Sequence, residues 1–257
     1  MKITILGSGS AYGTPMIFNT WGKADANIFE NKRTRASLLI EEQGHSLLVD
    51  AGPDLRNQIN DNNIKNIDSV WITHGHYDHI AGIPELPRAT KLLGHGIDIY
   101  SSKETSDELK QCYGYLYKDK AEAEPDSKSL RWHILPDNGE VKIGTLKFAT
   151  VLFPHHHIHS SALRYENFAY ITDWQAIPED IGCFLNDLDL LIVECNNGTE
   201  PEANGHSDIF KIRELRERYN PKEIILSHLS TRIDYQNFQK EIPENCKLAY
   251  DGMQIYL

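Results

Sequence analysis

Short apolar segments separated by turn residues dominate the chain. Several are apolar at nearly every position, which is typical of strands buried on both faces of a sheet. We predict strands at residues 3–6, 37–40, 46–49, 69–73, 98–100, 145–153, 162–165, 168–172, 188–194, 223–227 and 247–250. Polar turn residues at 41–44 and 166–167 predict hairpins between the strands that flank them.

Three segments have a helical pattern instead. We predict helices at residues 53–60, 102–117 and 208–219. The third is the most clearly amphipathic, because Ile209, Ile212 and Leu215 fall on one face. The polar segment 118–129 is predicted to be an exposed loop. Strands interleaved with helices indicate a layered α/β fold in which helices cover sheets.

Composition narrows the class of protein. The 257 residues carry 26 basic and 37 acidic side chains, for a formal charge of −11, which argues against stable nucleic-acid binding through phosphate contacts. No apolar run approaches the roughly 18 residues of a membrane-spanning helix, and the first residues lack a signal core. The four widely spaced cysteines are expected to be reduced thiols. We expect one cytoplasmic domain spanning residues 1–257, without membrane association, with a homodimer left open.

Histidines are concentrated in two places. Seven of the twelve fall within residues 74–79 and 155–159. The first cluster reads His-Gly-His-Tyr-Asp-His and directly follows the predicted strand 69–73. A loop that leaves a strand can curl until these side chains converge, whereas a continuing strand would point them to opposite faces. Nitrogen and carboxylate donors without thiolates suit zinc, manganese or iron. The alternative is a solvated loop that contains these residues by coincidence.

The H-x-H-x-D-H motif, with Asp50-Ala51-Gly52 upstream of it, resembles the metallo-β-lactamase superfamily. The resemblance covers nearly the whole chain and includes the segments at residues 7–10, 170–173, 226–229 and 250–253. Within the superfamily, the combination is similar to the PhnP-type cyclic phosphodiesterase branch and more distantly to tRNase Z. The resemblance implies a four-layer αββα sandwich with a dinuclear metal site at one edge.

The resemblance also implies ligands for two divalent cations per chain, zinc or manganese, with iron as an alternative. The implied ligands are His74, His76 and His155 for the first cation, Asp78, His79 and His228 for the second, and Asp173 as a bridge. The third ligand of the first cation is the least defined. Family spacing favours His155, while His156 and His157 stay open as alternatives. The remaining histidines of this run would then orient ligands or contact substrate.

His206 lies just before the predicted helix 208–219, where PhnP-like enzymes aim a histidine at the substrate phosphate. The resemblance implies that His206 acts as a general acid or stabilises charge, which suits an imidazole near neutral pH. Alternatively, His206 caps the helix, although Ser207 or Asp208 would also serve as a cap. Asp78 is the second residue expected to take part in catalysis.

Five positions carry weaker expectations. Asp50 is expected to orient a ligand histidine. Asp251 either does the same or forms an Asp-Gly turn. Tyr113 and Tyr115, with Tyr117, would suit nucleobase stacking, but packing is the favoured interpretation of their alternation.

Two differences from PhnP-like proteins and tRNase Z limit what the resemblance implies about function. Residues 20–27 contain no cysteine, whereas PhnP-like proteins commonly carry a cysteine-rich structural zinc motif there. Asp173 follows His155 by only 18 positions, which leaves no room for the tRNA-grasping arm of tRNase Z. The leading hypothesis is a metal-dependent phosphodiesterase acting on a small substrate, such as a cyclic nucleotide. The alternatives are hydrolysis of a carbon ester, thioester or lactam, and a PqqB-like accessory role without hydrolysis.

Overall fold

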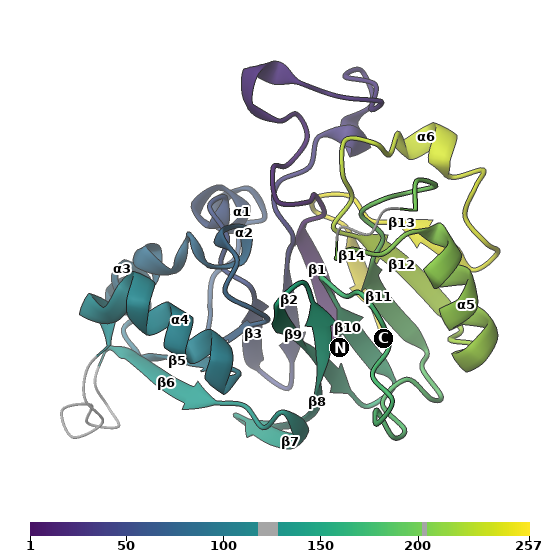
Figure 1. The fold of residues 1–257 in the computed structure, drawn as a ribbon. Helices are drawn as coiled ribbons and strands as arrows, with labels where there is room; N and C mark the ends of the chain where they lie inside the picture. The colour runs from purple at the N-terminus through teal and green to yellow at the C-terminus, as the bar shows by residue number, and fades with distance from the viewer. Residues whose placement is uncertain (118–127, 202–204) are drawn as a thin grey trace.

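The computed structural model describes residues 1–117, 128–201 and 205–257, so most of the predicted loop 118–129 lies outside the described residues. Within these ranges, two seven-stranded sheets pack face to face and helices cover both outer faces (Figure 1). The four-layer αββα sandwich expected from the sequence is therefore confirmed.

Each sheet combines antiparallel and parallel pairing. The first sheet has the order β14 (Gln254–Tyr256), β1 (Lys2–Gly7), β2 (Ser37–Glu42), β3 (His45–Val49), β4 (Ser69–Ile72), β5 (Ile97–Ser101) and β6 (Leu130–Ile134). The second has the order β13 (Cys246–Leu248), β12 (Glu223–Ser227), β11 (Leu190–Glu194), β10 (Phe168–Ile171), β9 (Ile158–Tyr165), β8 (Leu146–His155) and β7 (Asn138–Ile143). Pairing is antiparallel from β14 to β3 and from β7 to β10, and parallel from β3 to β6 and from β10 to β13.

Three apolar layers hold the sandwich together, one between the sheets and one under each set of helices. On β11, Leu190 and Ile192 point between the sheets, while Leu191 and Val193 pack under the outer helix. Because both faces of such a strand are buried, its sequence is apolar throughout instead of alternating. This explains why the central strands were predictable from apolar runs.

The helices divide between the two outer faces. Those of the first sheet are α1 (Leu55–Asp61), α2 (Tyr77–Ile80), α3 (Leu86–Leu93) and α4 (Lys103–Tyr113), and α5 (Ile209–Tyr219) covers the second. The remaining helical segments are α6 (Tyr235–Phe238) and the 3-10 turns η1 (Ile17–Asn19), η2 (Phe29–Asn31), η3 (Ile83–Glu85) and η4 (Gly114–Leu116). Asp208 caps α5 by accepting hydrogen bonds from the backbone amides of Phe210 and Lys211. No helix in the described ranges has the length and apolarity needed to cross a bilayer.

Several elements differ from the sequence prediction. Strands β6, β7 and β14 and helices α2, α3 and α6 were not predicted. Strand β7 alternates between exposed and half-buried residues over most of its length, so it lacks the apolar run of a central strand. Strand β9 begins at Ile158 instead of residue 162, because it continues the hairpin with β8 down to the histidine run.

Residues 20–27, which contain no cysteine, lie in a segment that is fixed by a buried polar network. It belongs to the N-terminal loop that projects beyond the sheets beside α6 (Figure 1). Asn31 Nδ2 donates to Asp234 Oδ2 at 2.7 Å, and Arg33 Nη2 donates to Asn31 Oδ1 at 2.8 Å. Arg33 also donates to the carbonyl of Ile233 at 3.0 Å, and burial lowers its pKa to about 10. These contacts tie the loop to the segment that follows β12.

The core between the sheets provides a test of this packing. Phe148 is fully buried and lies against Trp71 of the opposite sheet, with ring centroids 6.2 Å apart. We expect Phe148→Ala to lower the free energy of unfolding by about 3–5 kcal/mol, because it leaves a cavity. Phe29 is 71% exposed, so Phe29→Ala should change it by less than about 0.5 kcal/mol. Urea unfolding measures both, and equal losses would contradict the assignment of the core.

Candidate metal centre

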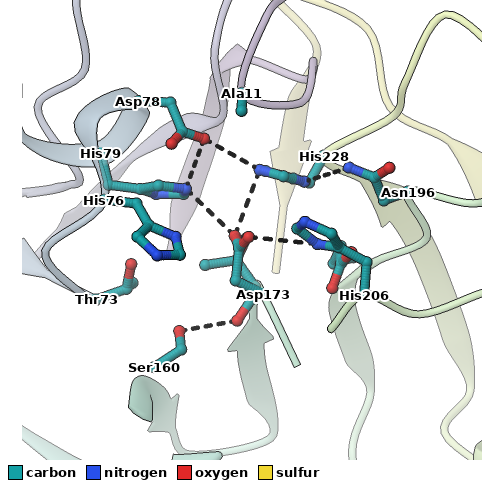
Figure 2. A network of polar contacts seen from close by, with 12 residues as sticks. Ala11, Thr73, His76, Asp78, His79, Ser160, Asp173, Asn196, His206 and His228 are labelled. Carbon is teal, nitrogen blue, oxygen red and sulfur yellow. Dashed lines mark hydrogen bonds and ion pairs between the residues drawn. The ribbon is translucent and has the colours of Figure 1, made fainter. Parts of the chain in front are cut away.

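All seven predicted ligands converge at one edge of the sandwich, and Figure 2 shows His76, Asp78, His79, Asp173 and His228 among them. They come from the loop after β4 and the start of α2 (His74, His76, Asp78 and His79), the last residue of β8 (His155), and the residues that follow β10 (Asp173) and β12 (His228). Both sheets thus contribute strand ends to one place. In sheets with parallel strands, the carboxyl ends commonly form the binding crevice.

The first donor group consists of three imidazoles. His74 Nε2 lies 3.0 Å from His76 Nδ1, and His155 Nε2 lies 3.3 Å from the same atom. Burial lowers the pKa of His74 well below its ordinary value and that of His155 to about 4. Both rings are therefore neutral, as a metal ligand must be. The structure places His155 in this group, whereas the exposed His157 belongs to none of the donor groups in the described chain.

The second donor group consists of Asp78, His79 and His228. Asp78 Oδ2 lies 3.0 Å from His79 Nε2 and 3.4 Å from His228 Nε2. All three side chains are buried, and His79 Nε2 lies near the oxygens of Asp78 and Asp173 without forming a hydrogen bond of good geometry. A buried imidazole nitrogen without a hydrogen bond is costly unless another partner, such as a cation, satisfies it.

Asp173 lies close to both donor groups, and Figure 2 shows its contacts with His79 and His228. Its Oδ2 is 3.2 Å from His79 Nε2 and 3.4 Å from His228 Nε2. Its Oδ1 is 3.5 Å from His155 Nε2 and 3.5 Å from His206 Nδ1. Burial acts to raise the pKa of Asp173, but His228, His79 and His74 lower it well below its ordinary value. The two oxygens of one ionised carboxylate thus face different donor groups.

Strand ends at the centre adopt an uncommon backbone conformation. Asp50, Asp173 and His228 have φ angles of 63°, 50° and 55°. This left-handed region costs a non-glycine residue about 1–3 kcal/mol and is most frequent at functional sites. The sharp turn at each of these residues directs its side chain across the end of the sheet.

A second set of residues orients the imidazoles. Asp50 Oδ2 accepts from His79 Nδ1 at 2.7 Å, as the sequence predicted. The carbonyl of Gly205 accepts from His155 Nδ1 at 2.8 Å, so that Nε2 of the same ring points into the centre. Thr73 Oγ1 lies 3.1 Å from His74 Nδ1, and the Asn196 amide lies 3.2 Å from His228 Nδ1. Partners of this kind fix which ring nitrogen is free to bind a metal.

Asp251 does not orient a ligand. It accepts hydrogen bonds from the backbone amide and hydroxyl of Ser8 and from those of Thr34. Of its two predicted roles, the turn at Asp251-Gly252 is the one observed, and the carboxylate joins the loop after β1 to the segment before β2.

The centre holds more buried negative charge than its side chains neutralise. Asp50, Asp78, Asp173 and Glu194 are all at least 95% buried, and in the described chain none forms an ion pair with lysine or arginine. Burial acts to lower the pKa of His79, but the surrounding carboxylates raise it well above its ordinary value, so a cation bound at His79 would replace a proton. Buried charges need compensation. Two divalent cations with nitrogen and oxygen ligands fit this donor set.

His206 lies beside Asp173 and is paired with a carboxylate that the sequence analysis missed. His206 Nδ1 donates to Glu194 Oε1 at 2.8 Å. Burial acts to lower the pKa of His206, but Glu194 outweighs it and raises the pKa to about 9. Asp208 caps α5, so the alternative role of His206 as the cap is wrong. The only sequence signal for Glu194 is an acidic residue at the end of an apolar strand.

The tyrosines near the end of α4 mainly pack, as expected. Tyr117 stacks on Trp132 with ring centroids 3.9 Å apart, and its hydroxyl donates to the carbonyl of Ser106 at 3.3 Å. Tyr115 is 74% exposed and Tyr113 is partly buried against the first sheet's outer core. These contacts explain the alternation without a bound base.

Comparison with known proteins agrees with this architecture. A crystal structure of a diphosphatase from the PhnP family has a TM-score of 0.87 and 25% identity, covering 100% of this chain and 97% of that one. The short form of human tRNase Z has a TM-score of 0.70 and 20% identity, covering 100% and 99%, which shows a shared fold.

Curated relatives point to the same superfamily. Ribonuclease Z of Alkaliphilus oremlandii is 25% identical over 330 residues, covering 98% of this chain and 97% of that protein. An octanoyltransferase of Porphyromonas gingivalis is 25% identical over 259 residues, covering 99% of this chain, and the chain spans about half (51%) of its length. The family described as "Beta-lactamase superfamily domain" matches residues 45–229. The chain belongs to this superfamily, and its sandwich is the metallo-β-lactamase fold.

Proposed function

We propose that this protein is a dinuclear-metal-dependent phosphodiesterase that cleaves small phosphodiesters, cyclic nucleotides among them. The observation that carries the proposal is the position of Asp173. Its two oxygens face two separate donor groups, and His206 lies 3.5 Å from one of them. A carboxylate shared in this way suits a pair of cations, with a proton donor beside them.

The cations we propose are zinc or manganese, with iron as an alternative. His74, His76 and His155 would hold one, Asp78, His79 and His228 would hold the other, and Asp173 would contact both. When bound, such a pair activates a water molecule and stabilises the attacking and leaving oxygens of a phosphoryl transfer.

The chain's own residues supply the proton. His206 lies beside Asp173 and its Nδ1 is held by Glu194, and we assign to this imidazole the donation of a proton to the leaving oxygen. Glu194 is fixed in turn, because it accepts from the backbone amides of Trp174 and Ser207 at 3.1 and 3.3 Å. This arrangement keeps the imidazole protonated and in one orientation.

The shape of the chain near the centre favours a small substrate. The 17 residues between His155 and Asp173 consist mainly of β9 and β10, which pair as a hairpin. No segment in this interval extends away as an RNA-binding arm, and the interval lies wholly within the described ranges. Together with the charge of −11, this favours a small phosphodiester over tRNA.

A second candidate is hydrolysis of an acyl ester or thioester on the same metals. It is favoured by the Porphyromonas gingivalis relative, which is named for octanoyl transfer and is about twice as long as this chain. A PqqB-like role without hydrolysis is a third candidate, since a zinc-bound PqqB has a TM-score of 0.74 at 17% identity.

A substrate panel separates these candidates. Protein loaded with zinc or manganese should hydrolyse bis(p-nitrophenyl) phosphate and 2′,3′-cyclic nucleotides, and chelation should abolish the activity until metal is restored. Turnover of p-nitrophenyl acyl esters or octanoyl thioesters, with phosphodiesters inert, would select the acyl candidate. Ligand binding without any turnover would favour the accessory role.

The metal ligands can be tested apart from activity. We expect His76→Ala to lose about one cation and Asp173→Ala to lose both, because Asp173 faces both donor groups. Both should lose at least about 100-fold in activity, the upper end of what removing a partner behind a metal ligand costs. Elemental analysis after dialysis measures the content. His157→Ala is the matched control, and unchanged metal in the first two variants would refute the assignment.

The proton donor and its carboxylate form a coupled pair. We expect His206→Ala to lower kcat by about 100- to 10,000-fold with the metals retained, as for loss of a general acid. Glu194→Gln should lower kcat by about 10- to 100-fold with little change in KM, because the imidazole loses its orientation. Adding Glu194→Gln to His206→Ala should cost nothing more.

Glu200→Gln, which alters an exposed carboxylate, serves as the control for this pair. A further loss in the double variant would show that Glu194 does not act through His206.

A further inference from the structure

His156 lies beside the metal centre without belonging to the proposed ligand set. It is the first residue of the two-residue turn between β8 and β9, in which His155 pairs with Ile158. Its φ angle is 50°, a left-handed conformation that favours glycine or asparagine. Its side chain is exposed, so burial of the ring does not explain a histidine at this position.

The imidazole of His156 lies close to two proposed metal ligands and to the proposed proton donor. Its ring centroid is 4.5 Å from that of His155, 5.7 Å from His206 and 6.2 Å from His76. Ring nitrogens of His155, His156 and His206 all lie within 4.8 Å of one another. His156 therefore faces the space between the first donor group and the proposed proton donor.

A glycine on another segment makes room for this ring. Gly205 has a φ angle of 77°, and a Cβ added there would lie only 2.4 Å from His156 Cε1 and 2.6 Å from its ring nitrogens. Its carbonyl also holds His155. The left-handed backbone of His156 and the absence of a side chain at Gly205 thus combine to seat an imidazole beside the centre. A left-handed non-glycine residue such as His156 is typical of functional sites.

Positive charge lies near the same turn. Lys211 Nζ donates to the carbonyls of Gln175 and His206 at 2.9 and 3.3 Å. The backbone amide of Gln175 donates to the carbonyl of Pro154, two residues before His156. An imidazole with free N–H capacity and a nearby ammonium favour an anionic partner.

We propose that His156 binds a non-bridging oxygen of the substrate's phosphoryl group from the side of His76 and His155. The contact makes the centre selective for anionic phosphoesters over neutral acyl substrates. It also holds the phosphoryl group while His206 delivers a proton to the leaving oxygen. This inference rests on the proposed phosphodiesterase function and deepens it.

The test compares zinc-loaded wild-type protein with His156→Ala, His156→Gln and His157→Ala. His157 is the matched control, because it is an exposed histidine in the same turn and outside the donor groups. Calorimetric titration with inorganic phosphate measures anion binding without turnover. We expect His156→Ala to weaken phosphate binding about 10-fold or more, the effect of losing a hydrogen bond to a charged group. His156→Gln, which keeps an N–H donor, should retain part of it, and His157→Ala should match wild type.

Kinetics give a second readout. For bis(p-nitrophenyl) phosphate, His156→Ala should raise KM more than it lowers kcat. Equal phosphate affinities in His156→Ala and His157→Ala would overturn the proposal. Loss of metal from both His156 variants would also overturn it, since the residue would then support the metal centre. If the wild-type protein has no phosphodiesterase activity, the proposed function is wrong. The phosphate titration would still test whether His156 binds an anion.

Discussion

Buried negative charge at one edge of the sandwich is the constraint on which the rest of this structure depends. Asp50, Asp78, Asp173 and Glu194 are withdrawn from water and have histidines as their only ionisable partners among the described side chains. An ionised carboxylate is costly to bury unless it is paired and hydrogen-bonded. The cost is tolerable if divalent cations occupy the centre, because their charge exceeds what the imidazoles alone provide. Charge balance and donor geometry thus lead independently to the same conclusion.

The sandwich is what makes such a centre possible. Each sheet contributes ends of strands whose other residues are locked between apolar layers, so the donors stand on rigid supports. The left-handed residues Asp50, Asp173 and His228 occur where these supports end. The packing of the strands therefore offsets the free-energy cost of the left-handed backbone at these three residues. The loops that follow need little conformational freedom.

The sequence predicted those parts of the molecule whose signal is local. Central strands were identified because both faces are buried, and the candidate ligands of the H-x-H-x-D-H motif because they are adjacent in the chain. Strands β6, β7 and β14 were missed because their residues are partly exposed. Glu194 was missed because its role depends on contacts with His206 and Trp174. These residues are distant in sequence and come together only in the folded chain. The same holds for His156, whose position depends on Gly205.

The choice of the bond that is cleaved depends on groups outside the metal ligands. Proteins of this fold bear names as different as diphosphatase, tRNase Z and PqqB, so the fold alone does not determine the chemistry. In this chain, the β9–β10 hairpin is short. The edge of the centre is therefore formed by the turn at His156 and by the segment that carries His206. The imidazoles of His156 and His206 lie beside His155 on this side, whereas the carboxylates of Glu104 and Glu108 lie by His159 and Gly75. An anionic group would gain from the proposed contact with His156, whereas a neutral carbonyl would gain little, and the proposed phosphoester chemistry depends on this difference.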